Sequence, residues 1–166
     1  EVRQLDVGWD VLRSVRAEVL HAMQRGALRE LRLLSMDSVL EDDDSLAAFA
    51  AALQQTPHLE QLRTHITVSS VSVLGVFFAA VRRLHIQAMS LSLQNIGADA
   101  GKALCDVLNG LHDTLEQLEL MCGSTDFWSL VLKQLHAPKL KKLVVACFDL
   151  RVAQMADLCA LLSRMP

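Results

Sequence analysis

Six histidines are the residues of this chain that could most readily hold a metal ion or transfer protons. They are His21, His58, His65, His85, His112 and His136. No two of them have the HExxH spacing that would place two imidazoles on one helical face. Three of them fall at the ends of predicted helices, where a cation interacts favourably with the helix dipole. We therefore predict no metal site, and we note His65 because its position in a predicted strand faces the open side of a sheet.

Two short runs resemble ligand-binding loops. The acidic run Glu41–Asp44 lacks the glycine and the distal glutamate of an EF-hand. An acidic N-terminus of the following helix explains it, with a partner contact as the alternative. The run Gly97–Gly101 lacks the lysine and the spacing of a phosphate-binding loop, and a turn into a helix explains it.

No serine, threonine or cysteine has a recognisable nucleophile setting. We expect no catalytic residue, no cofactor and no enzymatic activity.

The four cysteines favour unpaired thiols. Cys105, Cys122, Cys147 and Cys159 contain no CxxC pair and no zinc-binding spacing. Disulfides in a secreted protein are the alternative, but the chain is neither small nor rich in cysteine. We expect buried free thiols and an intracellular location, cytoplasmic or nuclear.

Composition limits the kind of partner. The formal net charge is −3 and the lysines and arginines are scattered, whereas a phosphate-binding protein shows a basic surplus or stripe. Nucleic acid is therefore a minor alternative. The longest apolar run, Val71–Val81, is well short of the roughly 20 residues that a membrane span requires. Apolar residues make up 52% of the chain with few aromatics, which suits thin, closely stacked layers.

One phrase recurs along the chain: apolar, two variable residues, apolar, one variable residue, apolar. It starts at Val2, Leu28, Leu59, Ile86, Leu115 and Leu140. Repeats of roughly 20–29 residues are typical of strand-and-helix repeat proteins, and one of these intervals is slightly longer. The fourth phrase can also be placed two residues later, at Ala88, and a shift of two residues keeps the same face inward.

Helical patterns separate the phrases. They are predicted over 10–23, 45–55, 98–111, 126–136 and 153–163. In the second of these, Asp44 or Ser45 is the expected N-cap, and Thr56 with Pro57 ends the helix. A short strand and one helix cannot bury their own apolar face, so copies must stack into a parallel sheet covered by a layer of helices.

Strand alternation assigns the faces of the predicted sheet. The fourth, sixth and eighth residues of each phrase point inward. The eighth position is Trp9, Ser35, Ile66, Leu93, Cys122 and Cys147. Five of these six residues are apolar, so we expect Cys122 and Cys147 in the core.

The run from Gln94 to Leu104, followed by Thr114–Leu120, resembles the ribonuclease-inhibitor class of leucine-rich repeats. Gln94 stands where that class has asparagine, and the other phrases lack this amide. The resemblance implies an α/β leucine-rich-repeat solenoid of about six repeats, with short parallel strands on the concave side and helices on the convex side. Residues 1–166 would form a single domain. Neither end has the polar cap of a terminal repeat, so we expect a slice of a longer solenoid.

The family implied by this resemblance binds proteins along the concave sheet. The outward positions that we predict to bind a protein partner are Glu30, Arg32, Leu34, Gln61, Arg63, His65, Ser90, Ser92, Gln117, Glu119, Met121, Lys142 and Val144. Mixed charge with scattered apolar residues is typical of protein-binding surfaces. We therefore predict an interaction scaffold, either a recognition module or a structural subunit of a larger assembly. The alternative is the ligand-sensing repeat region of a multidomain receptor.

Overall fold

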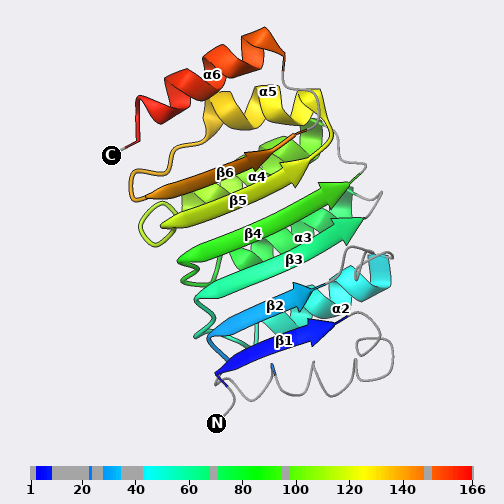
Figure 1. Cartoon of the computed structure of the whole chain (residues 1–166). Helices are drawn as coiled ribbons and strands as arrows, with labels where there is room; N and C mark the ends of the chain where they lie inside the picture. The colour runs from blue at the N-terminus through cyan, green and yellow to red at the C-terminus, as the bar shows by residue number, and fades with distance from the viewer. Residues whose placement is uncertain are drawn as a thin grey trace.

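Six short parallel strands lie side by side in the order in which they occur in the sequence. The computed structural model describes residues 3–8, 23, 28–34, 43–67, 71–94, 98–147 and 151–165. Its strands are β1 (Gln4–Gly8), β2 (Glu30–Leu34), β3 (Gln61–Thr67), β4 (Ala88–Gln94), β5 (Gln117–Cys122) and β6 (Lys142–Ala146). The described helices are α2 (Asp43–Leu53), α3 (Val71–Val81), α4 (Ala98–Gly110), α5 (Thr125–Gln134) and α6 (Val152–Leu162). Figure 1 shows the described helices on one side of the sheet, and no element of the described residues covers the other side.

The strand register aligns the recurring phrases of the sequence. The fourth residues of the phrases pair directly across the sheet, as Leu5, Leu31, Leu62, Met89, Leu118 and Leu143. Met89 is the partner of both Leu62 and Leu118. This register selects the placement of the fourth phrase that starts at Ile86 rather than at Ala88.

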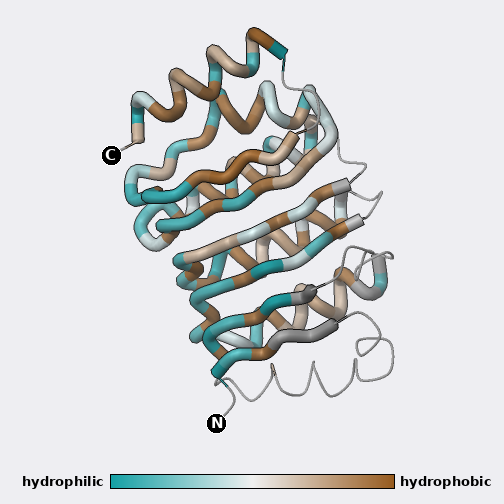
Figure 2. The backbone as a smooth tube through the Cα atoms, in the orientation of Figure 1, coloured by the Kyte–Doolittle hydropathy of each residue, from teal (hydrophilic) through white to brown (hydrophobic). Residues whose placement is uncertain are grey.

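Alternation along the strands buries the predicted face. In β4, Met89, Leu91 and Leu93 are at most 2% exposed, and β5 buries Leu118, Leu120 and Cys122 in the same way. Figure 2 shows the alternation as hydrophobic and hydrophilic residues along the strands. Fully burying one such side chain is worth about 1.5–3 kcal/mol, so the column of apolar residues accounts for a large part of the stability.

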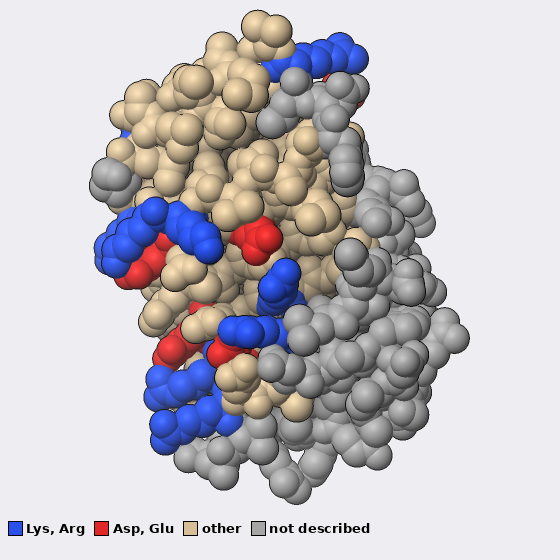
Figure 3. Space-filling view, in the orientation of Figure 1, with Lys and Arg blue, Asp and Glu red and all other residues tan. Residues whose placement is uncertain are grey.

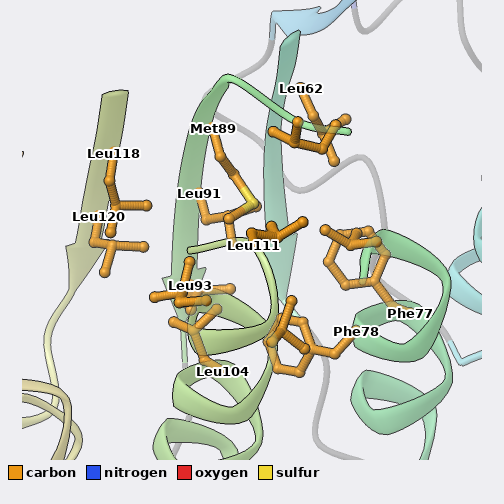
Figure 4. Packing of buried hydrophobic residues seen from close by; sticks show 14 of the residues in the cluster. Leu62, Phe77, Phe78, Met89, Leu91, Leu93, Leu104, Leu111, Leu118 and Leu120 are labelled. Carbon is orange, nitrogen blue, oxygen red and sulfur yellow. The ribbon is translucent and has the colours of Figure 1, made fainter. Parts of the chain in front are cut away.

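The helices complete the core from behind the sheet. Figure 4 shows Leu62 and Met89 of the strands facing Phe77 and Phe78 of α3 and Leu104 of α4. The ring of Phe77 stacks on Phe49 of α2 at 6.1 Å between centroids. These aromatic contacts join neighbouring helices as well as the helix layer and the sheet.

Backbone hydrogen bonds connect each strand to the next at its beginning. One carbonyl accepts from two successive N–H groups, those of the residue just before the following strand and of its first residue. The accepting carbonyls belong to Arg3, Arg29, Glu60, Gln87 and Glu116. The spacing of the repeated phrases therefore fixes hydrogen bonds as well as apolar contacts.

Three expectations about the helices need correction or completion. α2 begins at Asp43, so Asp44 and Ser45 lie in its first turn rather than at the N-cap. α3 coincides with an apolar run in which no helix is predicted, because apolar residues such as Val76, 49% exposed, also occupy its exposed side and leave no amphipathic pattern. The helix expected over 10–23, together with Trp9 and Ser35, lies outside the described residues except for Met23.

The last unit is less buried than the units before it. Leu143, Val145 and Cys147 point inward but are only half-buried. On α6, Val152 is 88% exposed and Leu162 is 50% exposed. The expectation that Cys147 belongs to the core therefore holds only in part, because it packs against the core cluster without being covered by it.

Leu118→Asp should unfold the protein, because it places an unpaired charge where the side chain is 1% exposed. The expected loss is about 4 kcal/mol or more in the free energy of unfolding. Met121→Asp is the matched control, since Met121 is 40% exposed on the opposite face of the same strand. Circular-dichroism melts should show a folded control and an unfolded Leu118 variant. Two equally stable variants would mean that the faces of β5 are assigned wrongly.

Thr64→Val should raise the free energy of unfolding by about 1 kcal/mol, because a buried hydroxyl without a partner costs stability. Thr64 is 3% exposed, and its Oγ1 finds no hydrogen-bond partner among the described residues. Thr56→Val is the matched control, since its buried Oγ1 donates to the carbonyl of Leu53 at 2.7 Å. Denaturant titrations should show changes of opposite sign. A comparable loss in both variants would indicate that Thr64 has a partner.

Candidate partner-binding face

The outward-pointing residues of the six strands form three rows across the open face of the sheet. The first row is Gln4, Glu30, Gln61, Ala88, Gln117 and Lys142. The second row is Arg32, Arg63, Ser90, Glu119 and Val144, and Arg32 is paired with Asp6 in the register. The third row contains His65, Ser92, Met121 and Ala146, and Leu34 is paired with Gly8. The register thus brings the predicted partner-binding residues onto one surface, which we call the open face.

These residues differ in how much surface they offer. Those that are exposed are Gln61, Arg63, Gln117, Met121 and Lys142. Those that are half-buried are Glu30, Arg32, Ser90, Ser92, Glu119 and Val144. Leu34 lies outside the side chains that the structure describes. The exposed and half-buried residues together form a continuous polar surface with a few apolar positions.

His65 is the predicted residue whose accessibility differs most from expectation. Its place in β3 puts it on the open face, between Arg63 and Thr67 on the same strand and beside Ser92 of β4. It is nevertheless only 8% exposed, so it offers little surface to a partner. Strand alternation predicts the side of the sheet on which a residue lies, but it does not predict how deeply its neighbours cover it.

Some charged side chains on and beside the open face form ion pairs with each other, and others do not. Arg32 forms an ion pair with Oε1 of Glu30 on the same strand. The geometry of this contact is not that of a hydrogen bond. Next to the open face, Glu116 pairs with Lys141 at 2.9 Å. Within the described part of the chain, Arg63 and Lys142 form no ion pair. Figure 3 shows the charged side chains of both signs gathered over the lower and middle parts of this face.

A hollow of about 280 Å³ opens on the face between β2 and β6. Its floor is β4, which presents the small side chains of Ala88 and Ser90 to the open side. Gln61 and Arg63 of β3 line one side of the hollow, and β5 lines the other. Sequence reasoning places these residues on the face but does not predict a hollow. The available signal is that β4 has small residues at three successive outward positions, Ala88, Ser90 and Ser92.

The positions considered for other chemistry lie apart from this hollow. No three described histidines, cysteines or acidic residues lie close enough together to hold a metal ion. His112 caps the end of α4, with Nδ1 at 2.8 Å from the carbonyl oxygen of Asn109. Gly101 is buried in the first turn of α4, where a Cβ would lie 3.2 Å from the ring of Phe127. Its small size serves helix packing in this position.

The four cysteines are free thiols that differ in exposure. Burial raises the pKa of Cys105 to about 12, and the negative charge of Asp106 adds to this shift. Burial also raises the pKa of Cys122. Because the thiolate is the reactive form, these two groups are protonated and unreactive at neutral pH. Cys159 on α6 is exposed.

None of the helices in the described ranges combines the length and the apolar character that crossing a membrane requires. The longest described helix is α4, and it carries charged residues on its exposed side.

The raised pKa of Cys105 predicts a pH dependence of stability. The folded state keeps the proton that the unfolded state loses above the ordinary pKa of 9.0. This contribution is complete below pH 9 and is lost as the pH rises toward 12, by up to about 1.4 kcal/mol per pH unit. Cys105→Ala should flatten the decline measured by denaturant titration between pH 9 and 11. Exposed Cys159→Ala is the control and should retain it; equal slopes in both would show that Cys105 is not the group responsible.

The chain matches no known protein-family model, and no curated protein matches it by sequence. The arguments for its function therefore rest on the residues and the geometry of the open face.

Proposed function

We propose that this chain belongs to a leucine-rich-repeat solenoid of the ribonuclease-inhibitor class and that its open face is the concave, partner-binding side. The recurring phrase and the in-register column of Leu31, Leu62 and Leu118 support the solenoid. The shared carbonyls at the beginning of each strand support it too, because they repeat the same connection from unit to unit.

The observation that carries the binding function is the hollow on the open face. Helices cover the other side of the sheet, and no described element covers this one (Figure 1). At about 280 Å³ the hollow is slightly smaller than the roughly 300–1,000 Å³ of typical small-molecule sites. Its size suits a few side chains of a protein partner. The surrounding mixture of charged, amide and apolar residues is typical of protein interfaces. We therefore propose a protein-interaction role and no catalytic one.

The state of the thiols supports an intracellular setting for this function. All four cysteines are unpaired, and Cys105 and Cys122 are buried in the apolar core. Free buried thiols are usual in reducing compartments, whereas small secreted domains rely on disulfides. We propose that the protein acts inside the cell.

Ser90→Phe should remove partner binding without unfolding the protein, because it fills the hollow from an outward position where an aromatic residue is favourable in a strand. The test is affinity purification from the protein's own cells with mass spectrometry, comparing the wild type, Ser90→Phe and Lys102→Glu. Lys102 is the control because it is exposed on α4, in the helix layer. A discrete partner that is lost only with Ser90→Phe is expected. Partners retained with Ser90→Phe but lost with Lys102→Glu would move the interface to the helices.

A further inference from the structure

The hollow on the open face is lined by residues of β2 to β6, and its outward β4 residues, Ala88 and Ser90, begin a trough that follows this strand. Ala88, Ser90 and Ser92 occupy three successive outward positions of β4, and all three are small; Gln94 holds the next such position, at the end of the strand. The adjacent strands carry longer side chains at the same levels, with Arg63 and Glu119 on either side of Ser90. Long side chains on both neighbours of a strand with small side chains leave a channel parallel to the strand.

The dimensions of this trough favour an extended chain. Neighbouring strands are about 4.8 Å apart, so β3 and β5 lie about 10 Å apart on either side of β4. An α-helix with its side chains is about 10–12 Å wide. The side chains of β3 and β5 narrow the available space further. An extended segment can lie along β4, whereas a helix would remain above the walls.

The charges around the trough favour an acidic occupant. Its lining contains Arg32, Arg63 and Lys142 but only one acidic residue, Glu119, although the chain as a whole carries a net charge of −3. Arg32 and Arg63 are direct partners in the register of β2 and β3. Like charges directly opposite each other on neighbouring strands are unfavourable. Glu30 pairs with Arg32, but no described residue forms an ion pair with Arg63.

We propose that the trough along β4 binds an extended peptide segment of a protein partner and that Arg63, with Arg32 beside it, binds an acidic side chain of that segment. This inference rests on the proposed function and specifies the chemistry of the partner. A guanidinium group can hold a carboxylate through two parallel hydrogen bonds. Ser90 lies beside Arg63 in the register and adds a hydroxyl at the floor of the trough.

A nucleic acid fits this surface less well than an acidic peptide. The three cations do not form a continuous track, and Glu119 would repel a phosphate backbone on the β5 side. The lining contains no aromatic side chain on which a base could stack. A single carboxylate placed at Arg63 avoids Glu119, whereas a chain of phosphates does not.

The experiment is a selection of binders from a displayed library of random twelve-residue peptides on the wild-type protein. Selected peptides are then synthesised with each acidic residue either retained or replaced by its amide. We expect an Asp or Glu at a fixed position in the selected peptides. Amide replacement at that position and Arg63→Gln in the protein should each weaken binding about 10-fold or more. Lys102→Gln removes the same charge from the helix layer and should leave the affinity unchanged.

One further variant, Ser90→Phe, and one further probe, polyuridylate, distinguish the ways in which the proposal could fail. If Ser90→Phe abolishes peptide binding while Arg63→Gln and amide replacement change nothing, the trough is the binding surface but acid recognition is wrong. If neither Ser90→Phe nor Arg63→Gln affects the selected peptides or the captured partner, both this inference and the proposed function fail. If polyuridylate displaces the peptides with a steep salt dependence, the surface serves nucleic acid and the peptide proposal is overturned.

Discussion

Burial of one face of the sheet is the constraint on which the rest of this structure depends. A strand of five to seven residues with one helix cannot remove its own apolar side chains from water. The strands therefore align, so that Leu31, Leu62, Met89 and Leu118 form one buried column against the helices. The shared backbone carbonyls at the beginning of each strand follow from the same alignment, because neighbouring units approach each other in the same way each time.

The requirement that buries one face also leaves the other face free to vary. Inward positions accept only side chains that fit between the sheet and the helices, and Thr64 is the one polar residue that β3 places there. Outward positions have no such restriction, so they can hold charges, amides and residues of any length. The trough along β4 arises from this freedom. Three small residues in one strand are enough to create a channel when both neighbouring strands carry longer side chains.

Side-chain hydrogen bonds link neighbouring elements of this structure, but they do not determine its arrangement. Trp128 donates its indole N–H to the carbonyl of Cys122 at 2.8 Å and so ties α5 to the end of β5. Gln154 is buried on α6 and donates to the carbonyl of Thr125 at 2.7 Å, which links the last two helices. Asn109 accepts from the backbone N–H of His136 at 2.8 Å and connects the end of α4 to the loop after α5. The bonds of Trp128 and Gln154 satisfy polar groups of buried side chains that packing would otherwise leave without a partner.

The sequence by itself determined the parallel α/β arrangement, the inward face of each strand and the set of residues on the open face, because strand alternation and the spacing of leucines are local properties. It did not predict α3, because apolar residues occupy the exposed side of this helix as well as the buried side and leave no amphipathic pattern. The burial of His65, the pairing of Arg32 with Glu30 and the trough at Ser90 were decided only by the tertiary structure. The burial of His65 and the trough depend on the size of side chains that the register brings together from strands about 30 residues apart in the chain, and no local pattern encodes those distances. The Arg32–Glu30 pair lies within β2, where alternation places both residues on one face but does not determine that their side chains pair.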